Sequence, residues 1–313
     1  MRKPFLIYNP ASGQWRSRRA RQIAGVVQVF RDAGIQPEVS ATTHKGSAIR
    51  QTQEAISAGF DTIIACGGDG TANEALNGLM AAGSEVPLGV LPLGSGNLLA
   101  TGLRLSSRAE VAARTLLQYQ PRTIRPGVLS SQVGSGTQCR YFLVAAGIGS
   151  DAELMYRTAV EAKERWGRNA YFLEMARMAL SHRMTMFQVE WEDEHGAKKQ
   201  EQVSLAMAIR ASRFPGLLQW VSLGSSLTQD HYTLLLFRTD KVRHFMNYFA
   251  SVASGRNWSV PQVGVVSARS FRCTSAGQNH VHSQADGELL GSVPAEISIA
   301  NSSFRLLMPA RSV

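Results

Sequence analysis

The sequence predicts an α/β protein with an N-terminal parallel-sheet domain and a C-terminal β-rich, sandwich-like domain. Two observations lead to this prediction. Over about the first 120 residues, short apolar runs alternate with stretches of helical periodicity, which is typical of a parallel sheet covered by helices. After about residue 124, short β-rich runs follow one another between turn residues, which favours antiparallel strands.

Hydrophobic periodicity and stop signals predict the elements of the first domain in order. The stretch 16–33, for example, has apolar residues at helical spacing and is followed by Gly34, a common helix terminator. The expected strands cover residues 4–9, 37–42, 61–68 and 87–94. The expected helices cover residues 16–33, 48–58, 71–80, 97–100 and 109–117.

The second domain is predicted from β-rich runs that are bounded by turn residues. These runs cover residues 127–133, 139–148, 186–193, 203–209, 232–238, 263–273, 295–301 and 304–309, and helices are expected at about 151–182 and 240–254. We therefore expect one domain over residues 1–124 and another over 125–301, with a tail at about 302–313 that returns to the first.

Charge and composition narrow the class of partner and the compartment. The 313 residues include 33 Lys and Arg against 23 Asp and Glu, so phosphate-bearing ligands or an anionic membrane surface are favoured. We find no nucleic-acid-binding motif and expect no nucleic-acid partner. The three cysteines are far apart, and neither a secretory signal nor a run of about 18 apolar residues is present. A cytoplasmic protein without a membrane-spanning helix is expected.

The stretch CGGDGT at 66–71 lies between a predicted strand and a predicted helix. Glycines let main-chain N–H groups approach a phosphate, and the following helix N-terminus favours an anion. Asp69 suits a magnesium shell, a ribose hydroxyl or a water network. The alternative interpretation is a tight turn in which Asp69 caps the helix. The spacing matches neither a Walker A loop nor a dinucleotide fingerprint.

Two further polar, glycine-bearing loops follow other predicted strands. One is Gly94-Ser95-Gly96-Asn97, and the other is the stretch from Asn9 to Gly13. In a parallel sheet the carboxyl ends of the strands meet at one edge, where α/β proteins bind their ligands. The three loops together therefore predict a nucleotide-binding site at that edge.

The motifs NPASG, GGDGTANE, PLGSGN and a late DGE resemble the catalytic domain of the diacylglycerol kinase family, which includes soluble bacterial lipid kinases and is similar to sphingosine kinases. The segments FLVAAGIGSDAEL and ADGELLG are also similar to that family. The resemblance implies an ATP-binding domain of the NAD kinase and diacylglycerol kinase type, a β-rich lipid-acceptor domain, and an active site between them.

The resemblance also implies roles for individual residues. Glu288 would be the general base, and Asp286, together with Asp69, would hold magnesium. Asp230, which is followed by His231 instead of glycine, is the nearest counterpart of a further acidic metal site. The nucleotide would contact Asn9, Ser12, Gly13, Thr42 or Thr43, Gly67, Gly68, Asp69, Gly70, Thr71, Asn73 and Ser95.

Two positions depart from the family pattern. Leu98 and Arg125 stand where many bacterial members carry aspartate. Two carboxylates of a nucleotide and water network are therefore missing, so either the network is built differently or catalysis is weaker.

The resemblance, together with the positive net charge, implies an ATP- and Mg²⁺-dependent lipid kinase of phospholipid metabolism that works at an anionic membrane surface as a peripheral protein. The lipid alcohol that accepts the phosphate and the oligomeric state, including a homodimer, stay open. Two alternatives also stay open: a NAD kinase, which shares the GGDGT loop, and a non-catalytic nucleotide-binding membrane sensor, which the missing carboxylates would suit.

Overall fold

The computed structural model describes residues 1–12, 19–150, 184–193, 196–211, 226–244, 247–248, 261–275 and 280–310. The chain divides into two compact units, which are residues 1–126 with 300–313 and residues 127–299. The first unit contains a mostly parallel sheet with helices, and the second is built on an antiparallel sheet. The predicted fold class is thus confirmed.

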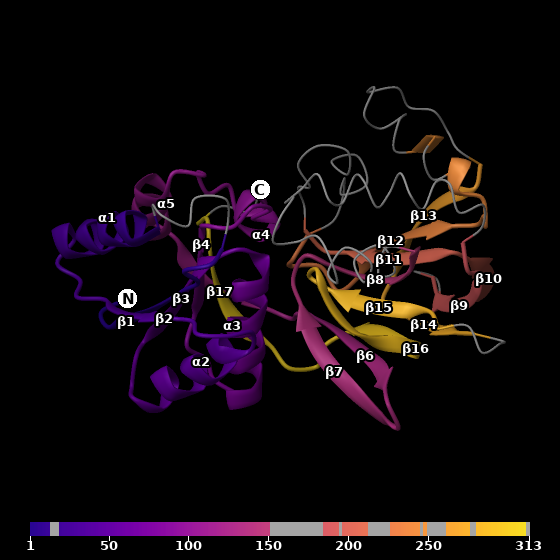
Figure 1. Cartoon of the computed structure of the whole chain (residues 1–313), viewed down its shortest axis with the longest axis horizontal. Coiled ribbons are helices and arrows are strands. Elements are labelled where there is room, and N and C mark those ends of the chain that lie inside the picture. The colour runs from indigo at the N-terminus through magenta and orange to yellow at the C-terminus, as the bar shows by residue number, and fades with distance from the viewer. Residues whose placement is uncertain are drawn as a thin grey trace. The chain divides into compact units, whose positions relative to one another are not determined.

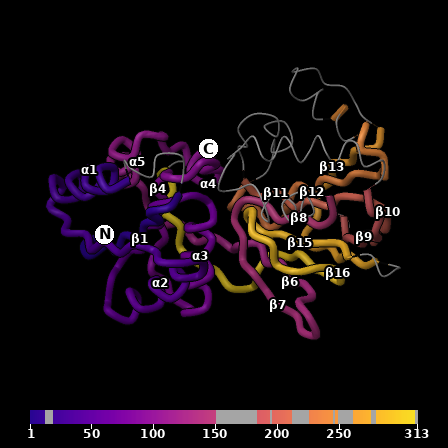
Figure 2. Tube along the Cα trace, viewed as in Figure 1, coloured from indigo at the N-terminus to yellow at the C-terminus, as the bar shows by residue number. Residues whose placement is uncertain are grey.

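The sheet of the first unit has six strands in the order β2-β1-β3-β4-β17-β5. The strands β1 to β4 pair in parallel, whereas the edge strand β5 pairs antiparallel with β17. Figure 2 shows the yellow C-terminal segment that contains β17 within this unit. The strands are β1 (Pro4–Tyr8), β2 (Glu38–Ala41), β3 (Thr62–Gly67), β4 (Leu88–Pro92), β5 (Gln120–Ile124) and β17 (Phe304–Met308).

Helices cover both faces of this sheet, with α1 and α5 on one face and α2 and α3 on the other (Figure 1). A Cβ added at Gly78 of α3 would lie 2.7 Å from the carbonyl oxygen of Ile49, so α2 and α3 pack closely. All six residues of β3 are buried between the two helical layers. The helices are α1 (Arg19–Asp32), α2 (Ser47–Ser57), α3 (Asp69–Ala82), α4 (Leu98–Gly102) and α5 (Ala109–Leu116).

In the second unit, the described strands form an 11-stranded antiparallel sheet. Phe142, Phe187, Tyr232 and Phe271 belong to its buried core. The strands are β6 (Gly127–Val133), β7 (Gly136–Phe142), β8 (Ala145–Gly149), β9 (Phe187–Glu192), β10 (Lys198–Val203), β11 (Leu205–Ile209), β12 (Tyr232–Phe237), β13 (Val263–Ala268), β14 (Ser270–Thr274), β15 (His282–Ala285) and β16 (Glu288–Ile299).

Several element boundaries differ from those predicted. The run 263–273 contains two strands, β13 and β14, which pair with different partners, and the run 139–148 spans the end of β7 and most of β8. The sequence did not predict β5, β10 or β15. Helix α3 begins at Asp69 rather than at Thr71. The helix expected at 151–182, and most of that expected at 240–254, lie outside the described residues.

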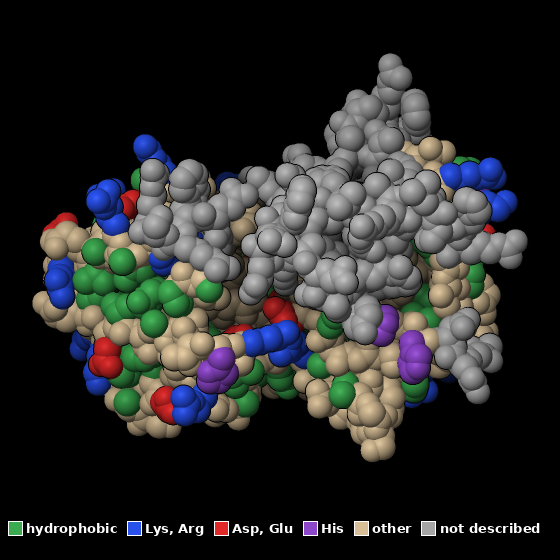
Figure 3. All heavy atoms as spheres, in the orientation of Figure 1, with side chains coloured by type: hydrophobic (Ala, Val, Ile, Leu, Met, Phe, Trp, Pro, Cys, Tyr) green, Lys and Arg blue, Asp and Glu red, His purple; other side chains and the backbone are tan. Residues whose placement is uncertain are grey.

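Within the described part of the chain, no helix combines the length and apolar character needed to cross a membrane. Figure 3 shows Lys and Arg side chains at several separate places on the drawn face of each unit, with other side-chain types between them. The described Lys and Arg side chains of that face are thus spread over it and do not gather in a single patch.

Candidate functional site

Three loops of the first unit begin at neighbouring strand ends. In the parallel register, Tyr8 of β1 lies opposite Cys66 of β3, and Gly67 lies opposite Pro92 of β4. The chain leaves all three strands at the same edge of the sheet, as the alternation of strands and helices predicts. The geometry therefore brings the three predicted glycine-bearing loops to one edge.

The carboxylate of Asp69 links two of these loops. Its Oδ2 accepts a hydrogen bond from the N–H of Leu98 at 3.0 Å, and its Oδ1 accepts one from the N–H of Leu99 at 3.0 Å. These amides open α4, whose N-cap residue Asn97 makes no side-chain capping bond and has a φ of 53°. Asp69 thus caps a neighbouring helix instead of its own. The sequence did not indicate this contact, because the partners lie 29 and 30 residues further along the chain.

Glycines allow the same two loops to touch. A Cβ added at Gly94 would lie 2.3 Å from the Cα of Gly68, and one added at Gly96 would lie 3.2 Å from Oδ2 of Asp69. A side chain at Gly94 is therefore excluded unless a main chain moves.

The first loop is also joined to the end of β4. The hydroxyl of Ser12 can share its one proton between the carbonyl oxygens of Leu93, at 3.1 Å, and of Asn9, at 3.0 Å. The N–H of Asn9 donates to the carbonyl of Cys66 at 3.2 Å, which joins this loop to β3. Hydrogen bonds therefore connect all three loops. The predicted residue Gly13 lies outside the described residues.

Arg19 is a buried cation beneath the first loop, with only 4% of its surface exposed. Its guanidinium donates to the carbonyl of Ser12 and, at 3.0 Å, to Oε1 of Gln22. Burial lowers the pKa of Arg19. Burial also raises the pKa of the Cys66 thiol, and the positive charge of Arg19 offsets part of that rise. The sequence did not single out Arg19, because it lies within a run of arginines and nothing local indicates which one is buried.

The second loop leads into an N-terminus that suits a phosphate. Gly68 is the N-cap of α3 and forms no side-chain capping bond. The N–H of Thr71 donates to the carbonyl of Gly68, at 3.1 Å, at the start of the helix. The N–H groups of Asp69 and Gly70 come before it in the chain and lie in the first turn, where main-chain donors have no acceptor within the helix. Main-chain donors at the positive end of a 14-residue helix fit the phosphate groups of a nucleotide.

The other predicted nucleotide contacts differ in exposure. Ser95 is exposed, whereas Asn73 is only 2% exposed and accepts hydrogen bonds from the amide of Asn77. The side chain of Asn97 closes the loop around Ser95, since it accepts from the N–H of Gly94 and donates to the Gly94 carbonyl, both at 2.8 Å.

The described residues can bind magnesium only together with the phosphate groups of a bound nucleotide. No group of three or more His, Cys, Asp or Glu side chains in the described ranges is arranged to hold a metal ion. Mg²⁺ is commonly held by about one or two carboxylates together with substrate phosphates and water. Asp69 offers one such carboxylate beside the glycine loops.

In the second unit, the predicted DGE turn joins β15 to β16. Oδ1 of Asp286 accepts from the N–H groups of Val144, at 2.8 Å, and Ala145, at 3.0 Å, and Oδ2 accepts from Leu143 at 2.9 Å. Asp286 and Gly287 both have positive φ, 49° and 85°. The Asp286 carboxylate thus fixes the turn against the residues that lead into β8.

The remaining predicted acidic residues of the second unit flank strands. Glu288 is half-buried and begins β16, opposite Ala285, whereas Asp230 is exposed and precedes β12. Glu288 therefore follows a turn whose main chain is held by Asp286.

The two positions that depart from the family pattern lie in the first unit. Leu98 supplies one of the amides that bind Asp69. Nε of Arg125 donates to the carbonyl of Ala300 at 2.8 Å, and the N–H of Ala300 donates to the carbonyl of Pro126 at 2.9 Å. Arg125 thus ties together the two chain segments where the first unit ends and resumes.

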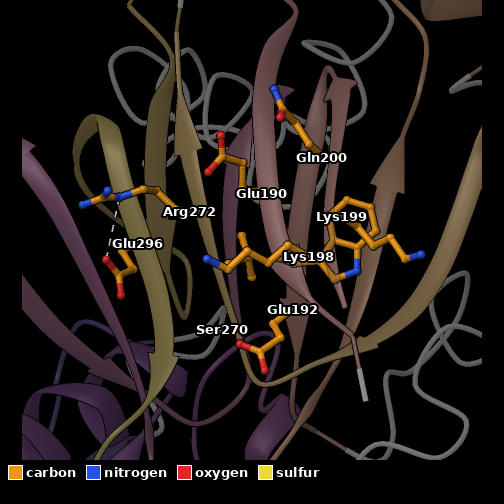
Figure 4. Close-up of a pocket in the computed structure, with 10 residues that line it drawn as sticks. Glu190, Glu192, Lys198, Lys199, Gln200, Ser270, Arg272 and Glu296 are labelled. Atoms are coloured by element: carbon orange, nitrogen blue, oxygen red, sulfur yellow. Dashed lines mark ion pairs between the residues drawn. The ribbon is translucent and has the colours of Figure 1, made fainter. Parts of the chain in front are cut away.

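A pocket of about 480 Å³ lies on β9, β10, β14 and β16 (Figure 4). Charged side chains pair across its strands, since Arg272 lies opposite both Glu190 and Glu296 and is 3.9 Å from the Glu296 carboxylate. Glu288 begins β16, whereas Glu296 lies near the other end of that strand. The pocket contains none of the predicted site residues.

The comparison with family models identifies residues 3–129 as similar to the diacylglycerol kinase catalytic domain. This range includes the three glycine-bearing loops and the loop that carries Thr42 and Thr43.

Similarity to curated relatives extends over the whole chain. A diacylglycerol kinase of Bacillus subtilis is 29% identical over 311 residues, which cover 99% of this chain and 97% of the relative. A protein of Chromohalobacter salexigens named "Probable lipid kinase YegS-like" is 36% identical over 171 residues, 54% of this chain and 51% of the relative.

Among solved structures, a diacylglycerol kinase from Bacillus anthracis has a TM-score of 0.68 at 18% identity, over 99% of this chain and 98% of that one. At this identity the similarity concerns the fold, and it agrees with the two-unit α/β and β-rich architecture.

Proposed function

We propose that this chain, in which residues 3–129 match the diacylglycerol kinase catalytic domain, is a lipid kinase that transfers the γ-phosphate of ATP to a hydroxyl group of a lipid alcohol. The observation that carries the proposal is the hydrogen-bonded set of three loops at one edge of the first sheet. Ser12 joins the loop after β1 to the end of β4, and Asp69 joins the loop after β3 to α4.

In this proposal, the first unit binds the nucleotide. The phosphates lie against the main-chain N–H groups of Gly68, Asp69 and Gly70 at the start of α3, where the helix dipole favours negative charge. Asn9, Ser12, Gly67, Thr71, Asn73 and Ser95, together with Gly13 and a threonine at 42 or 43, complete the set of proposed contacts. The role of Asp69 in holding α4 keeps this main chain in place.

The second unit is proposed to present the acceptor and the base. The Glu288 carboxylate removes the proton of the lipid hydroxyl as the hydroxyl oxygen forms a bond to the γ-phosphorus. The bond from that phosphorus to the bridging oxygen breaks, and ADP leaves with the electron pair. Phosphoryl transfer depends mostly on positioning and charge stabilisation. The turn that Asp286 fixes would position Glu288, the proposed base.

Magnesium, when bound with ATP, would neutralise charge on the phosphates. We propose Asp69 and Asp286 as its protein ligands and Asp230 as a further acidic site. Each carboxylate oxygen can accept more than one contact, so the main-chain hydrogen bonds of Asp69 and Asp286 are compatible with this role.

The acceptor is proposed to reach the protein from an anionic membrane. The formal net charge of +10 favours such a surface, and a peripheral protein needs no spanning helix. A diacylglycerol-like lipid is the proposed class of acceptor, since the relative from Bacillus subtilis is named a diacylglycerol kinase.

Transfer of labelled γ-phosphate from Mg²⁺-ATP tests the proposal. The acceptors are a panel of lipid alcohols in anionic vesicles and, separately, NAD, and Glu288→Gln protein purified in parallel controls for contaminating kinases. A labelled lipid made only by the wild type is expected. Labelled NADP would instead indicate a NAD kinase. ATP binding without any labelled product would favour the non-catalytic sensor.

A further inference from the structure

We propose that Glu74 is a positioning residue of the nucleotide site and that it fixes the loop carrying Thr42 and Thr43. This inference rests on the proposed function. Glu74 lies on α3, little more than one helical turn beyond Asp69. It belongs to the GGDGTANE motif but is not among the residues to which the resemblance gives a role.

Both oxygens of the Glu74 carboxylate accept hydrogen bonds from the start of α2. Oε1 accepts from the N–H of Gly46 at 2.8 Å, and Oε2 accepts from the N–H of Ala48 at 3.1 Å. Gly46 is the N-cap of α2, has a φ of 86°, and has no side chain with which to cap the helix. Glu74 therefore provides the cap that the local sequence lacks.

The loop between β2 and α2 is held at both ends. The N–H of Thr42 donates to the carbonyl of Tyr8, at the end of β1, at 2.8 Å. The N–H of Thr43 donates to the hydroxyl of Ser47, in the first turn of α2, at 3.2 Å. Because Glu74 holds the start of α2, it sets where this loop lies relative to the glycine loop that opens α3.

Helix α3 thus uses two carboxylates to hold two neighbouring helices. Asp69 binds the first amides of α4, and Glu74 binds those of α2. A glutamine at position 74 keeps one acceptor oxygen but replaces the other by an NH2 group, so one of the two N–H donors would face another donor. The start of α2 would then shift, and the threonine loop would move away from its place beside the nucleotide.

Calorimetric titration of Mg²⁺-ATP into the full chain tests the inference. Glu74→Gln is expected to raise the Kd for ATP about tenfold, which corresponds to about 1.4 kcal/mol. The KM for ATP should rise in parallel, while kcat and the KM for the lipid stay near wild type. A role in stability alone would lower the folded fraction without changing the KM for ATP.

Glu54→Gln is the matched control. Glu54 lies on α2, is 62% exposed, and pairs with Arg50 at 3.7 Å, so the variant removes the same charge from the same helix pair. It is expected to leave the Kd for ATP within about twofold of wild type. An equal rise in both variants would overturn the inference and indicate a long-range charge effect.

Hydrogen exchange provides a readout independent of the nucleotide. In Glu74→Gln, the amides of Gly46 and Ala48 should lose protection, while those of β3 should keep it. If Glu74→Gln does not fold, Glu74→Asp provides the same measurements, with a smaller rise in Kd expected.

The outcomes separate this inference from the function on which it rests. A wild-type Kd for ATP in a folded Glu74→Gln protein overturns the positioning role and leaves the kinase proposal intact. Failure of the wild type to bind ATP overturns both.

Discussion

The glycine loops of the first unit and the DGE turn of the second use an aspartate in related ways. Asp69 accepts hydrogen bonds from two successive amides at the start of a helix, and Asp286 accepts them from three successive amides at the start of a strand. Asp69 holds one loop against another, whereas Asp286 holds the turn from which Glu288 emerges. The comparison shows that a carboxylate within a motif can fix the position of neighbouring main-chain segments through hydrogen bonds. This role does not depend on whether the carboxylate also binds a substrate or an ion.

The largest expected effect comes from removing the proposed base next to the turn. Glu288→Gln should lower kcat by about 100-fold or more and leave the Kd for ATP unchanged, because proton removal is lost while the first unit is intact. Steady-state kinetics with calorimetry measures both. Glu296→Gln, on the same strand, is the matched control and should retain activity. Near-normal turnover by a folded Glu288→Gln protein would remove this residue from the role of base.

A pair of variants compares the two aspartates directly. Asp286→Asn should lower the free energy of unfolding by about 3 kcal/mol and Asp69→Asn by about 2 kcal/mol, because the first loses more charge-assisted hydrogen bonds. Denaturant unfolding measures both values. If Asp69→Asn kept full stability and lost all activity, a direct role with phosphate or metal would outweigh its role in holding α4.

The last expected effect, comparable in size to that of Asp69→Asn, concerns the contact between the glycine loops. Gly94→Ala would place a Cβ 2.3 Å from the Cα of Gly68, so one loop must shift, at about 1–3 kcal/mol. Gly136→Ala is the control in the second unit, since its added Cβ would lie 3.9 Å from the nearest of the neighbouring atoms. Thermal unfolding of the two variants compares them. Equal stability would show that the loop containing Gly94 adapts without strain.

The sequence predicts the elements whose signals are local. The continuous apolar runs of β1, β3 and β4, and the glycines that follow them, mark three strand ends by residue type alone. Edge strands are harder to predict, because β5 and β10 are polar and their strand character depends on partners elsewhere in the chain. The division of the run 263–273 into β13 and β14 likewise depends on which strands accept each half.

The contacts that shape the site are the least predictable part. Local sequence favours a role for Asp69 and Glu74 at the start of α3 itself, yet both bind amides of other helices, 26 to 30 residues away. The partners of Asp286 lie 141 to 143 residues away. A carboxylate carries no local mark of which distant amide it will meet, since only the folded topology brings the two together.

The position of β17 between β4 and β5 has a consequence for the order of folding during synthesis. The edge strand β5 joins the first sheet through β17, so that sheet stays incomplete until residues 304–308 have emerged from the ribosome. All of residues 127–299 are made in the interval. The ribosome therefore releases the whole second unit before the first can close, and an unpaired edge of the first sheet is exposed to chaperones throughout that time.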